Sequence, residues 1–305
     1  MENSLARLLF LRNCLNAMAT CDSVVDVSSG LPTFVLCAGS ATATVFRHGA
    51  HVTSWTIKGQ ELLFVSKHAV FAPPKAIRGG VPLCWPQFSD FGSCKAQHGF
   101  ARNSDWSLKS GGADESGHAF VELELRSSDA TFALFPHAFS LRLRVALSPD
   151  GPLTMDLSAT NTGGAAFSFT TALHSYFRVP DVAFAGVSGV SGTLKGCTFL
   201  DSAAGRVRVV QATPVVRFDA EVDRIYLAVP ARLEVDAGAH KVQLATRALP
   251  DAVVWNPWVS KAAALPDFGD DEFKHMVCVE VAAVEHPIQL QPGATWSGGQ
   301  TLTLV

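Results

Sequence analysis

The chain has 305 residues and a formal net charge of −3, and 48% of its residues are hydrophobic while only 17% are charged. So low a charged fraction predicts that much of the chain is buried. The composition offers no concentrated basic patch of the kind that binds nucleic acid, and no run of about 18 apolar residues that would span a membrane. We therefore expect a globular protein with no nucleic-acid or membrane partner. A monomer is the default expectation, because no exposed apolar patch can be read from the sequence.

The cysteines and the common cofactor motifs exclude further classes. The seven cysteines are odd in number, scattered and without a CxxC pair, which indicates reduced thiols and a cytoplasmic location. Close Cys/His pairs of the kind that bind zinc are absent, so no metal is expected. The sequence also lacks the GxSxG, GxxxxGK[ST] and GxGxxG motifs. We therefore expect no nucleotide cofactor.

The N-terminal segment, residues 1–32, differs from the rest of the chain. Residues 2–19 have helical character and carry Arg7 and Arg12, as a weak organelle-targeting segment would. The acidic Glu2 and the early interruption of the apolar run by Arg12 favour a dispensable extension over a cleaved transit peptide. In the remaining chain, glycine and proline residues are distributed among turns and form no clear linker. Residues 33–305 are therefore expected to form a single domain.

From about residue 33 onward, apolar and polar residues alternate with a period of two, which is typical of half-buried antiparallel strands. A turn at 148–152 predicts a hairpin between the strands on either side of it. Because no long segment after residue 20 has a helical period, the expected class is all-β, a large antiparallel two-sheet sandwich. The expected strands are 42–46, 51–57, 61–65, 105–109, 119–126, 139–147, 153–159, 165–177, 224–229, 232–237, 241–247, 252–255, 277–282 and 300–305.

Segment 71–104 is irregular and rich in proline, glycine and aromatic residues. A long irregular segment within a compact domain is usually functional. This one can place five polar side chains at the mouth of the sandwich: Arg78, Lys95, Gln97, His98 and Arg102. A guanidinium donates two parallel hydrogen bonds and so suits an anion such as phosphate. For any single one of these residues, a solvated loop side chain is the simpler interpretation.

Two strand positions and one strand start carry ionisable groups. His174 lies on the more polar face of 165–177, where it can act as an acid or base near neutral pH or be an ordinary hydrogen-bonded histidine. Glu280 lies within the apolar strand 277–282, and burial would raise the pKa of its carboxyl unless an arginine pairs with it. Asp223 opens a strand, where it can bind a ligand, end a turn or pair with Arg224.

Several of these segments together resemble one known family. The chain is similar to glucose-6-phosphate 1-epimerases, also called hexose-6-phosphate mutarotases, within the aldose 1-epimerase group. The resemblance covers roughly residues 33–305, and the order of its motifs makes it specific. It is carried by IRGGVPLCWPQFSDFG at 77–92, QHGFARNSDW at 97–106, LHSYF at 173–177, DRIYL at 223–227 and the segment 255–280, followed by HPIQLQPGATWSGGQTL at 286–302.

The resemblance implies a galactose-mutarotase-type sandwich with the sugar on a concave sheet face. It also implies interconversion of the α and β anomers of an aldohexose 6-phosphate, glucose 6-phosphate above all. His174 is then the general acid that protonates the ring oxygen, and Glu280 is the general base, a scheme that requires His174 to be protonated at rest. The implied substrate-binding residues are Arg78, Gln97, His98, Arg102 and Asp223.

Two other functions remain open on the sequence alone. One is a mutarotase for free aldoses such as galactose or glucose, which would not need additional cations for a phosphate. The other is a non-catalytic sandwich that binds sugar phosphates. The presence of both His174 and Glu280 argues against it, because binding alone needs no matched acid and base. A glycosidase would require two carboxylates, and Glu280 is the one carboxylate whose position in a strand suggests a catalytic role.

Overall fold

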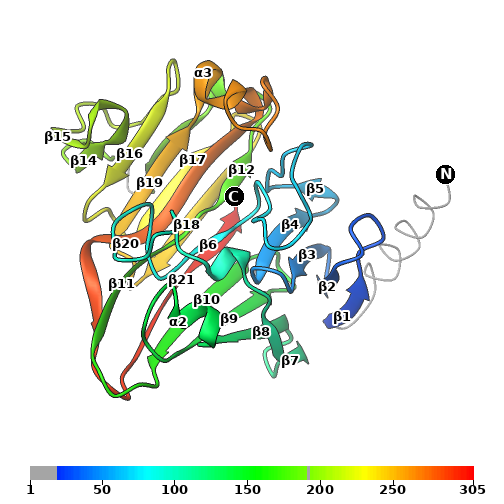
Figure 1. Cartoon of the computed structure of the whole chain (residues 1–305). Coiled ribbons are helices and arrows are strands. Elements are labelled where there is room, and N and C mark those ends of the chain that lie inside the picture. Colours follow the sequence, from blue (N-terminus) through cyan, green and yellow to red (C-terminus); the bar gives the residue numbers. More distant parts are fainter. Residues whose placement is uncertain (1–18, 191–192) are drawn as a thin grey trace.

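The computed structural model describes residues 19–190 and 193–305, and the strands in these ranges form three antiparallel sheets (Figure 1). Two large sheets form the layers of a sandwich, and a smaller sheet near the N-terminus adjoins them. The expectation of an all-β antiparallel sandwich is confirmed. No helix among the described residues is long and apolar enough to cross a membrane.

The small sheet has the order β1-β2-β3-β4-β5. Its strands are β1 (Thr20–Val25), β2 (Pro32–Ala38), β3 (Ala41–Phe46), β4 (His51–Ile57) and β5 (Gln60–Glu61). Strand β1 falls within the predicted N-terminal extension and pairs along its length with β2, from Thr20 opposite Cys37 to Val25 opposite Pro32. The predicted targeting segment lies mostly in residues 1–18, outside the described residues.

The second sheet has the order β13-β17-β18-β21-β10-β9-β8-β7. Its strands are β7 (Ser107–Ala113), β8 (Ala119–Arg126), β9 (Phe139–Leu147), β10 (Leu153–Asn161), β13 (Gly186–Gly189), β17 (Arg232–Asp236), β18 (Lys241–Arg247) and β21 (Thr295–Leu304). The predicted hairpin joins β9 to β10, with Leu147 opposite Leu153, and Gly151 N–H donates to the Ser148 carbonyl in its turn.

The third sheet, called the site sheet below, has the order β15-β14-β16-β19-β20-β11-β6, with β12 also paired to β20. Its strands are β6 (Leu83–Cys84), β11 (Phe167–Leu173), β12 (Tyr176–Arg178), β14 (Thr198–Asp201), β15 (Val207–Val210), β16 (Val222–Tyr226), β19 (Asp251–Asn256) and β20 (Met276–Leu290). Central strand β20 contacts β19 on one side and both β11 and β12 on the other.

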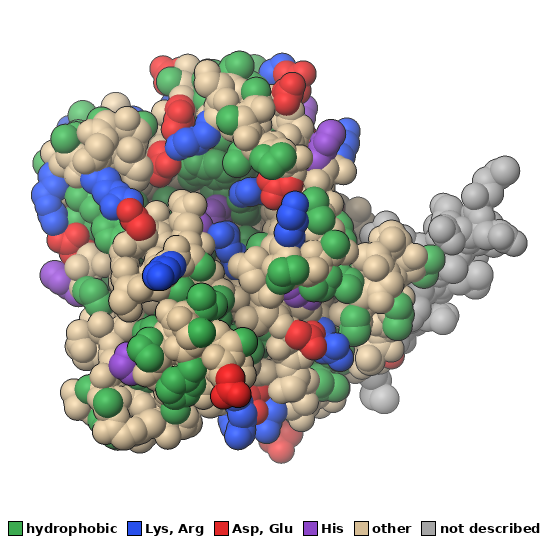
Figure 2. Space-filling model, in the orientation of Figure 1, with side chains coloured by type: hydrophobic (Ala, Val, Ile, Leu, Met, Phe, Trp, Pro, Cys, Tyr) green, Lys and Arg blue, Asp and Glu red, His purple; other side chains and the backbone are tan. Residues whose placement is uncertain are grey.

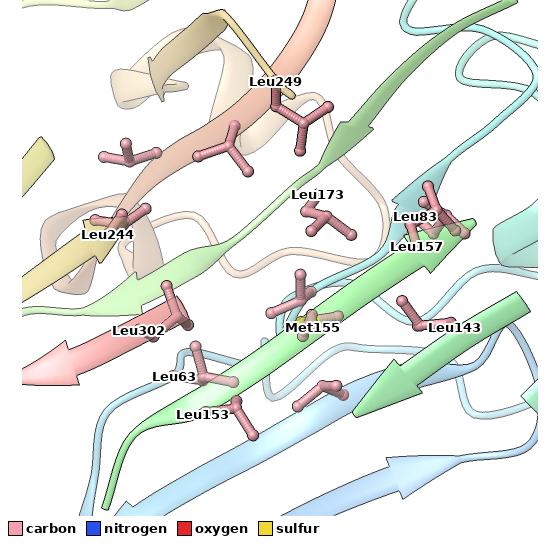
Figure 3. Close-up of a cluster of buried hydrophobic side chains, with 14 of the residues drawn as sticks. Leu63, Leu83, Leu143, Leu153, Met155, Leu157, Leu173, Leu244, Leu249 and Leu302 are labelled. Atoms are coloured by element: carbon pink, nitrogen blue, oxygen red, sulfur yellow. The ribbon is translucent and has the colours of Figure 1, made fainter. Parts of the chain in front are cut away.

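The main core lies between the two large sheets. Alternation along β20 turns Val277, Val279 and Val281 into this core, where Figure 3 shows Leu173 in one apolar cluster with Met155 and Leu302 of the second sheet. The same alternation turns the even-numbered residues of β20, Glu280 among them, to the opposite face of the site sheet. A second apolar cluster covers part of that face.

Helical segments are short and connect or cover the sheets. They are α2 (Asp129–Phe132), α3 (Trp258–Ala263) and the 3₁₀ turns η1 (Ala101–Asn103), η2 (Val182–Phe184), η3 (Ser202–Ala204) and η4 (Glu272–His275). The predicted irregular segment 71–104 contains only the two-residue strand β6 and the turn η1 as regular structure. It crosses the edge of the site sheet, where β6 pairs with β11.

Four local expectations need correction. The predicted strand 165–177 is divided into β11 and β12, while 277–282 is part of a much longer strand that ends at Leu290. Strands β1, β2, β6 and β13–β15 were not among the predicted ones. In β15 every residue is exposed, so no alternation marks it in the sequence. Five described cysteines are free, but Cys37 is disulfide-bonded, so the expectation of reduced thiols is wrong for that residue.

Candidate active site

His174 and Glu280 face each other across neighbouring strands. Leu173 is paired with Val281, and Tyr176 is paired with Cys278 in the same register. His174 and Glu280 therefore occupy directly opposite positions on β11/β12 and β20, where side chains on one face come into contact. His174 Nε2 lies 3.3 Å from Glu280 Oε1. The sequence placed His174 on the more polar face of its strand and Glu280 within an apolar strand, and the register brings the two together.

Both groups of the pair are deeply buried. His174 is 7% exposed and Glu280 is 1% exposed, and neither His174 Nδ1 nor Glu280 Oε2 has a hydrogen-bond partner among the described residues. Burial lowers the pKa of His174 well below its ordinary value, and the positive charges of Arg102 and Arg78 lower it further. Burial raises the pKa of Glu280 well above its ordinary value, with an added contribution from Asp223.

These directions correct one expectation from the sequence. A resting His174 protonated by the influence of Glu280 would require an ion pair in a buried site, and desolvation penalises both of those charges. The opposite shifts instead favour a neutral pair, with its proton on Glu280 and a neutral imidazole at His174. The pair then behaves as one unit that holds one proton.

His98 lies beside this pair on a tightly turned segment. Its ring centroid is 5.7 Å from that of His174. The backbone N–H of Ser89 donates to the ring nitrogen Nδ1 of His98 at 3.1 Å, and the backbone N–H of His98 donates to the Ser89 carbonyl at 2.8 Å. Burial and the nearby Arg102 lower the pKa of His98 to about 3, so the ring is neutral. Because Nδ1 accepts a hydrogen bond, Nε2 carries the hydrogen and can donate a hydrogen bond to a ligand.

The turn that carries His98 depends on backbone conformation. His98 itself has a φ of +63°, a region that few non-glycine residues adopt. Gly99 follows with a φ of +70°, and a Cβ at that position would lie 2.0 Å from the Trp85 carbonyl oxygen. Strain in a non-glycine residue of this kind is often found at functional sites, where surrounding structure holds it.

Gln97 directly precedes His98 in the chain, and the partly buried Arg102 follows it by four residues. Arg102 donates from Nη2 to the Gln97 carbonyl oxygen at 3.1 Å, while its buried Nε has no partner among the described residues. The guanidinium therefore keeps donor capacity for a ligand. Gln97 is exposed, and the contact described for it uses its backbone rather than its side chain. Its expected role in binding remains a prediction.

Arg78 is held in place by two partners from distant parts of the chain. Its Nε donates to Asp267 Oδ1 at 3.1 Å, and its Nη1 donates to the Tyr176 hydroxyl at 3.2 Å. Tyr176 in turn stacks on His174, with ring centroids 4.8 Å apart and planes 9° apart. Arg78 is thus connected to the pair through Tyr176, and Asp267 neutralises part of its charge.

A row of side chains crosses the site sheet beside the pair. Asp223 is paired with Trp255, Trp255 with Cys278, and Cys278 with Tyr176. Asp223 accepts a hydrogen bond at 3.2 Å from the side chain of Lys261, which lies on α3. The half-buried Trp255 ring meets the His174 ring edge-on at a centroid distance of 6.1 Å. This row supplies an aromatic surface and a carboxylate next to the pair.

Sequence reasoning gave no role to several residues that line this site. They are Trp255, Lys261, Asp267 and Cys278, together with Tyr176, which was noted only as a neighbour of His174. All of them lie in the segments that carry the family resemblance. For Cys278, the period-2 pattern that it shares with Glu280 was an available signal, whereas Trp255 joins the site only through strand register.

The side of the molecule shown in Figure 2 is hollowed over the site sheet. Hydrophobic side chains lie at the bottom of the hollow, and histidine and oppositely charged side chains lie around it. No group of three or more His, Cys, Asp or Glu side chains within residues 19–190 and 193–305 is arranged to hold a metal ion. The arrangement is that of a buried histidine–glutamate pair beside an aromatic surface, with charged side chains around it.

Comparison with known proteins identifies the family of the chain. Residues 32–303 match the aldose 1-epimerase family. A protein of Cenchrus ciliaris, provisionally named as a glucose-6-phosphate 1-epimerase, is 44% identical over 92% of this chain and 87% of its own length. A relative from Salmonella typhimurium with the same provisional name is 34% identical over 79% of each chain.

Solved structures show the same fold. The crystal structure of a provisionally named mutarotase from Salmonella typhimurium matches with a TM-score of 0.82 at 30% identity over 94% of each chain. A galactose 1-epimerase from Lactobacillus acidophilus matches with a TM-score of 0.70 at 14% identity, over 94% of this chain and 98% of its own. The expected galactose-mutarotase-type fold is confirmed. The chain belongs to the aldose 1-epimerase family.

Proposed function

We propose that the protein is an isomerase that interconverts the α and β anomers of an aldohexose 6-phosphate, with glucose 6-phosphate as the expected substrate. The observation that carries this proposal is the buried facing pair of His174 and Glu280, whose pKa values are shifted in opposite directions. A pair of titratable groups in such an environment is typical of acid–base catalysis. The names of the relatives support the choice of a hexose phosphate.

The reaction needs one proton given and one proton taken. Protonation of the ring oxygen and removal of the proton from the anomeric hydroxyl open the ring to the free aldehyde. Rotation about the adjacent carbon–carbon bond and the reverse proton transfers close the ring on the other face. In our assignment, His174 protonates the ring oxygen and Glu280 accepts the hydroxyl proton. Each general acid or base typically contributes about 10²–10⁴-fold.

Binding of the sugar can prepare the pair for this step. The anomeric hydroxyl would donate a hydrogen bond to the Glu280 carboxylate, and the ring oxygen would accept one from the protonated His174. Each of these bonds stabilises the charged form of its partner. The neutral resting pair would therefore become an acid and a base only when a sugar lies against it, which limits the cost of buried charges in the empty site.

The phosphate is assigned to the arginines at the rim. Arg102 makes one described side-chain hydrogen bond, from Nη2 to the Gln97 carbonyl, so its outer guanidinium nitrogens can donate further bonds to a phosphate. Arg78 already pairs with Asp267 and Tyr176, so it is better suited to hydroxyl groups or to a shared position on the phosphate. His98 would donate from Nε2 to a sugar hydroxyl, and Asp223 would accept from another. Gln97 is assigned to the rim of the same subsite.

The test is anomer exchange measured by NMR on the purified protein, with glucose 6-phosphate and glucose in parallel samples. The proposal expects exchange of glucose 6-phosphate well above the spontaneous rate, with much less acceleration for glucose. Equal acceleration of both sugars would instead indicate a mutarotase for free aldoses. Saturable binding of glucose 6-phosphate without faster exchange would indicate a binding protein and would overturn the proposal.

A further inference from the structure

The strand that carries His174 is interrupted at that residue. His174 N–H donates to the Pro82 carbonyl at 3.0 Å, and Ser175 N–H donates to the Leu173 carbonyl at 3.0 Å. Neither donor is therefore used for the ladder with β20. Strand β20 still bonds to the backbone at this interruption, because Val279 N–H donates to the Ser175 carbonyl at 3.1 Å. The strand is held on its other side, where Tyr176 N–H donates to the Gly80 carbonyl at 2.9 Å, so support from the Ser175 side chain is what can fix its position relative to β20 and Glu280.

Ser175 receives that support from the opposite layer of the sandwich. Its side chain points into the interior, because alternation turns it away from the face of His174. Gln300, on β21 of the second sheet, donates from Nε2 to Ser175 Oγ at 3.0 Å, and its Oε1 lies 3.4 Å from the same hydroxyl. Ser175 is 0% exposed and Gln300 is 2% exposed. The two side chains form a polar bridge between the sheets, 125 residues apart in the chain.

The surroundings of this bridge are apolar. Gln300 is paired with Met155 on β10, and its Nε2 lies 3.6 Å from the Met155 sulfur. Figure 3 shows Met155 and Leu302 in the same buried cluster as Leu173, the residue two before Ser175. An amide and a hydroxyl in such a place must be desolvated, and replacing both members of a buried hydrogen bond by apolar groups of similar shape is often neutral or stabilising. Stability alone therefore gives no physical reason for a polar bridge at this point.

We infer that Gln300 and Ser175 are positioning residues, which fix the interrupted strand so that His174 is held against Glu280. This inference rests on the proposed epimerase function, because it concerns the geometry of the same acid–base pair. Directional hydrogen bonds specify one backbone position, whereas apolar contacts allow the strand to shift by fractions of an ångström. Proton transfer is sensitive to such shifts, since a displacement of about 1 Å can cost about 10²-fold in rate.

The experiment compares Gln300→Met, Ser175→Ala and the double variant with the wild-type protein in the anomer-exchange assay. Each single variant should lower kcat for glucose 6-phosphate about tenfold, with KM changed less than about twofold, because the substrate-binding side chains stay in place. The double variant should also lose only about tenfold, since both substitutions break the same bridge. Its thermal stability should equal or exceed that of the single variants, because no buried polar group is left without a partner.

The matched control is Leu302→Met, a volume-conserving change in the same interior and on the same strand, two residues from Gln300. It should leave both kcat and stability close to wild type. A double variant that regains both stability and kcat would overturn the inference, as would single variants that lose stability and keep kcat. Failure of the wild-type protein to accelerate exchange would instead contradict the proposed function. The two failures are therefore distinguishable.

Discussion

Two buried glutamates in this protein lie in β-strands and have opposite chemistry. Glu124 on β8 and Glu280 on β20 are 4% and 1% exposed. Around Glu124, Arg126 Nε donates at 2.8 Å, Arg142 Nε donates at 3.0 Å and Ser140 donates at 2.9 Å. These hydrogen bonds, that from Arg126 above all, lower the pKa of Glu124 to about 2. Its carboxylate is a fixed structural anion.

Glu280 has a single described polar contact, to His174 at 3.3 Å, and its Oε2 has no partner among the described residues. Burial without compensating donors raises the pKa of its carboxyl. Low solvent exposure alone is therefore not the property that makes a carboxyl reactive, because Glu124 is shielded near the surface by largely exposed arginine side chains, whereas Glu280 lies deep in the protein. The difference lies in whether the surrounding side chains satisfy the charge, and an unsatisfied carboxyl keeps a proton that it can exchange.

The largest expected effect separates the two glutamates by activity. Glu280→Gln should lower kcat for anomer exchange by about 10²–10⁴-fold, because the amide cannot accept the hydroxyl proton. Binding of glucose 6-phosphate, measured by calorimetry, should stay within a fewfold of wild type. Glu124→Gln serves as the matched control and should leave kcat unchanged. A Glu280→Gln variant with a normal rate would remove the base assignment.

The next effect concerns the arginines. Those beside Glu124 are used by its carboxylate, whereas Arg102 keeps a buried Nε without a described partner near Glu280. Arg102→Ala should raise KM for glucose 6-phosphate about 10–100-fold, as expected for the loss of a charge-assisted hydrogen bond. Steady-state kinetics with free glucose should show a much smaller change. Equal changes for both sugars would argue against a phosphate role for Arg102.

A smaller effect is expected in the pH dependence of the stability that Glu124 contributes. Its folded-state pKa is lowered from 4.5 to about 2, so its stabilising contribution is present above pH 4.5 and is lost as the pH falls toward 2. Glu124→Gln should therefore cost about 1 kcal/mol at neutral pH, since its partners are partly exposed. The cost should shrink toward pH 3. Urea unfolding at the two pH values measures it, and a cost that does not depend on pH would contradict the charge-based explanation.

The smallest expected effect is the pH dependence of stability at Glu280, which has the opposite sign to that at Glu124. The folded-state pKa of Glu280 is raised, so its contribution to stability is most favourable below pH 4.5 and is lost as the pH rises. Because an amide side chain does not ionise, Glu280→Gln should be as stable as wild type or slightly more stable at neutral pH. That advantage should decrease on acidification, as measured by urea unfolding. A loss of stability at neutral pH similar to that of Glu124→Gln would show that the two glutamates have the same structural role.

The sequence by itself determined the fold class and most of the strands. Period-2 alternation located β8, β9 and β18 at their observed bounds, because one face of each strand is buried and the other is not. The turn at 148–152 specified the β9–β10 hairpin for the same local reason. The short or fully exposed strands β13–β15 gave no such signal. The order of motifs was enough to predict the family and to select His174 and Glu280.

Only the tertiary structure decided how the selected residues work together. Strand register places His174 opposite Glu280, and register depends on pairing between segments about a hundred residues apart. The opposite pKa shifts of the pair follow from burial, which no local pattern shows, and their direction runs against the expectation of a protonated His174. Asp267 reaches Arg78, and Gln300 reaches Ser175, because the fold brings distant segments into contact. Alternation gives the face on which a side chain lies, but its partners and its charge state depend on packing against the rest of the chain.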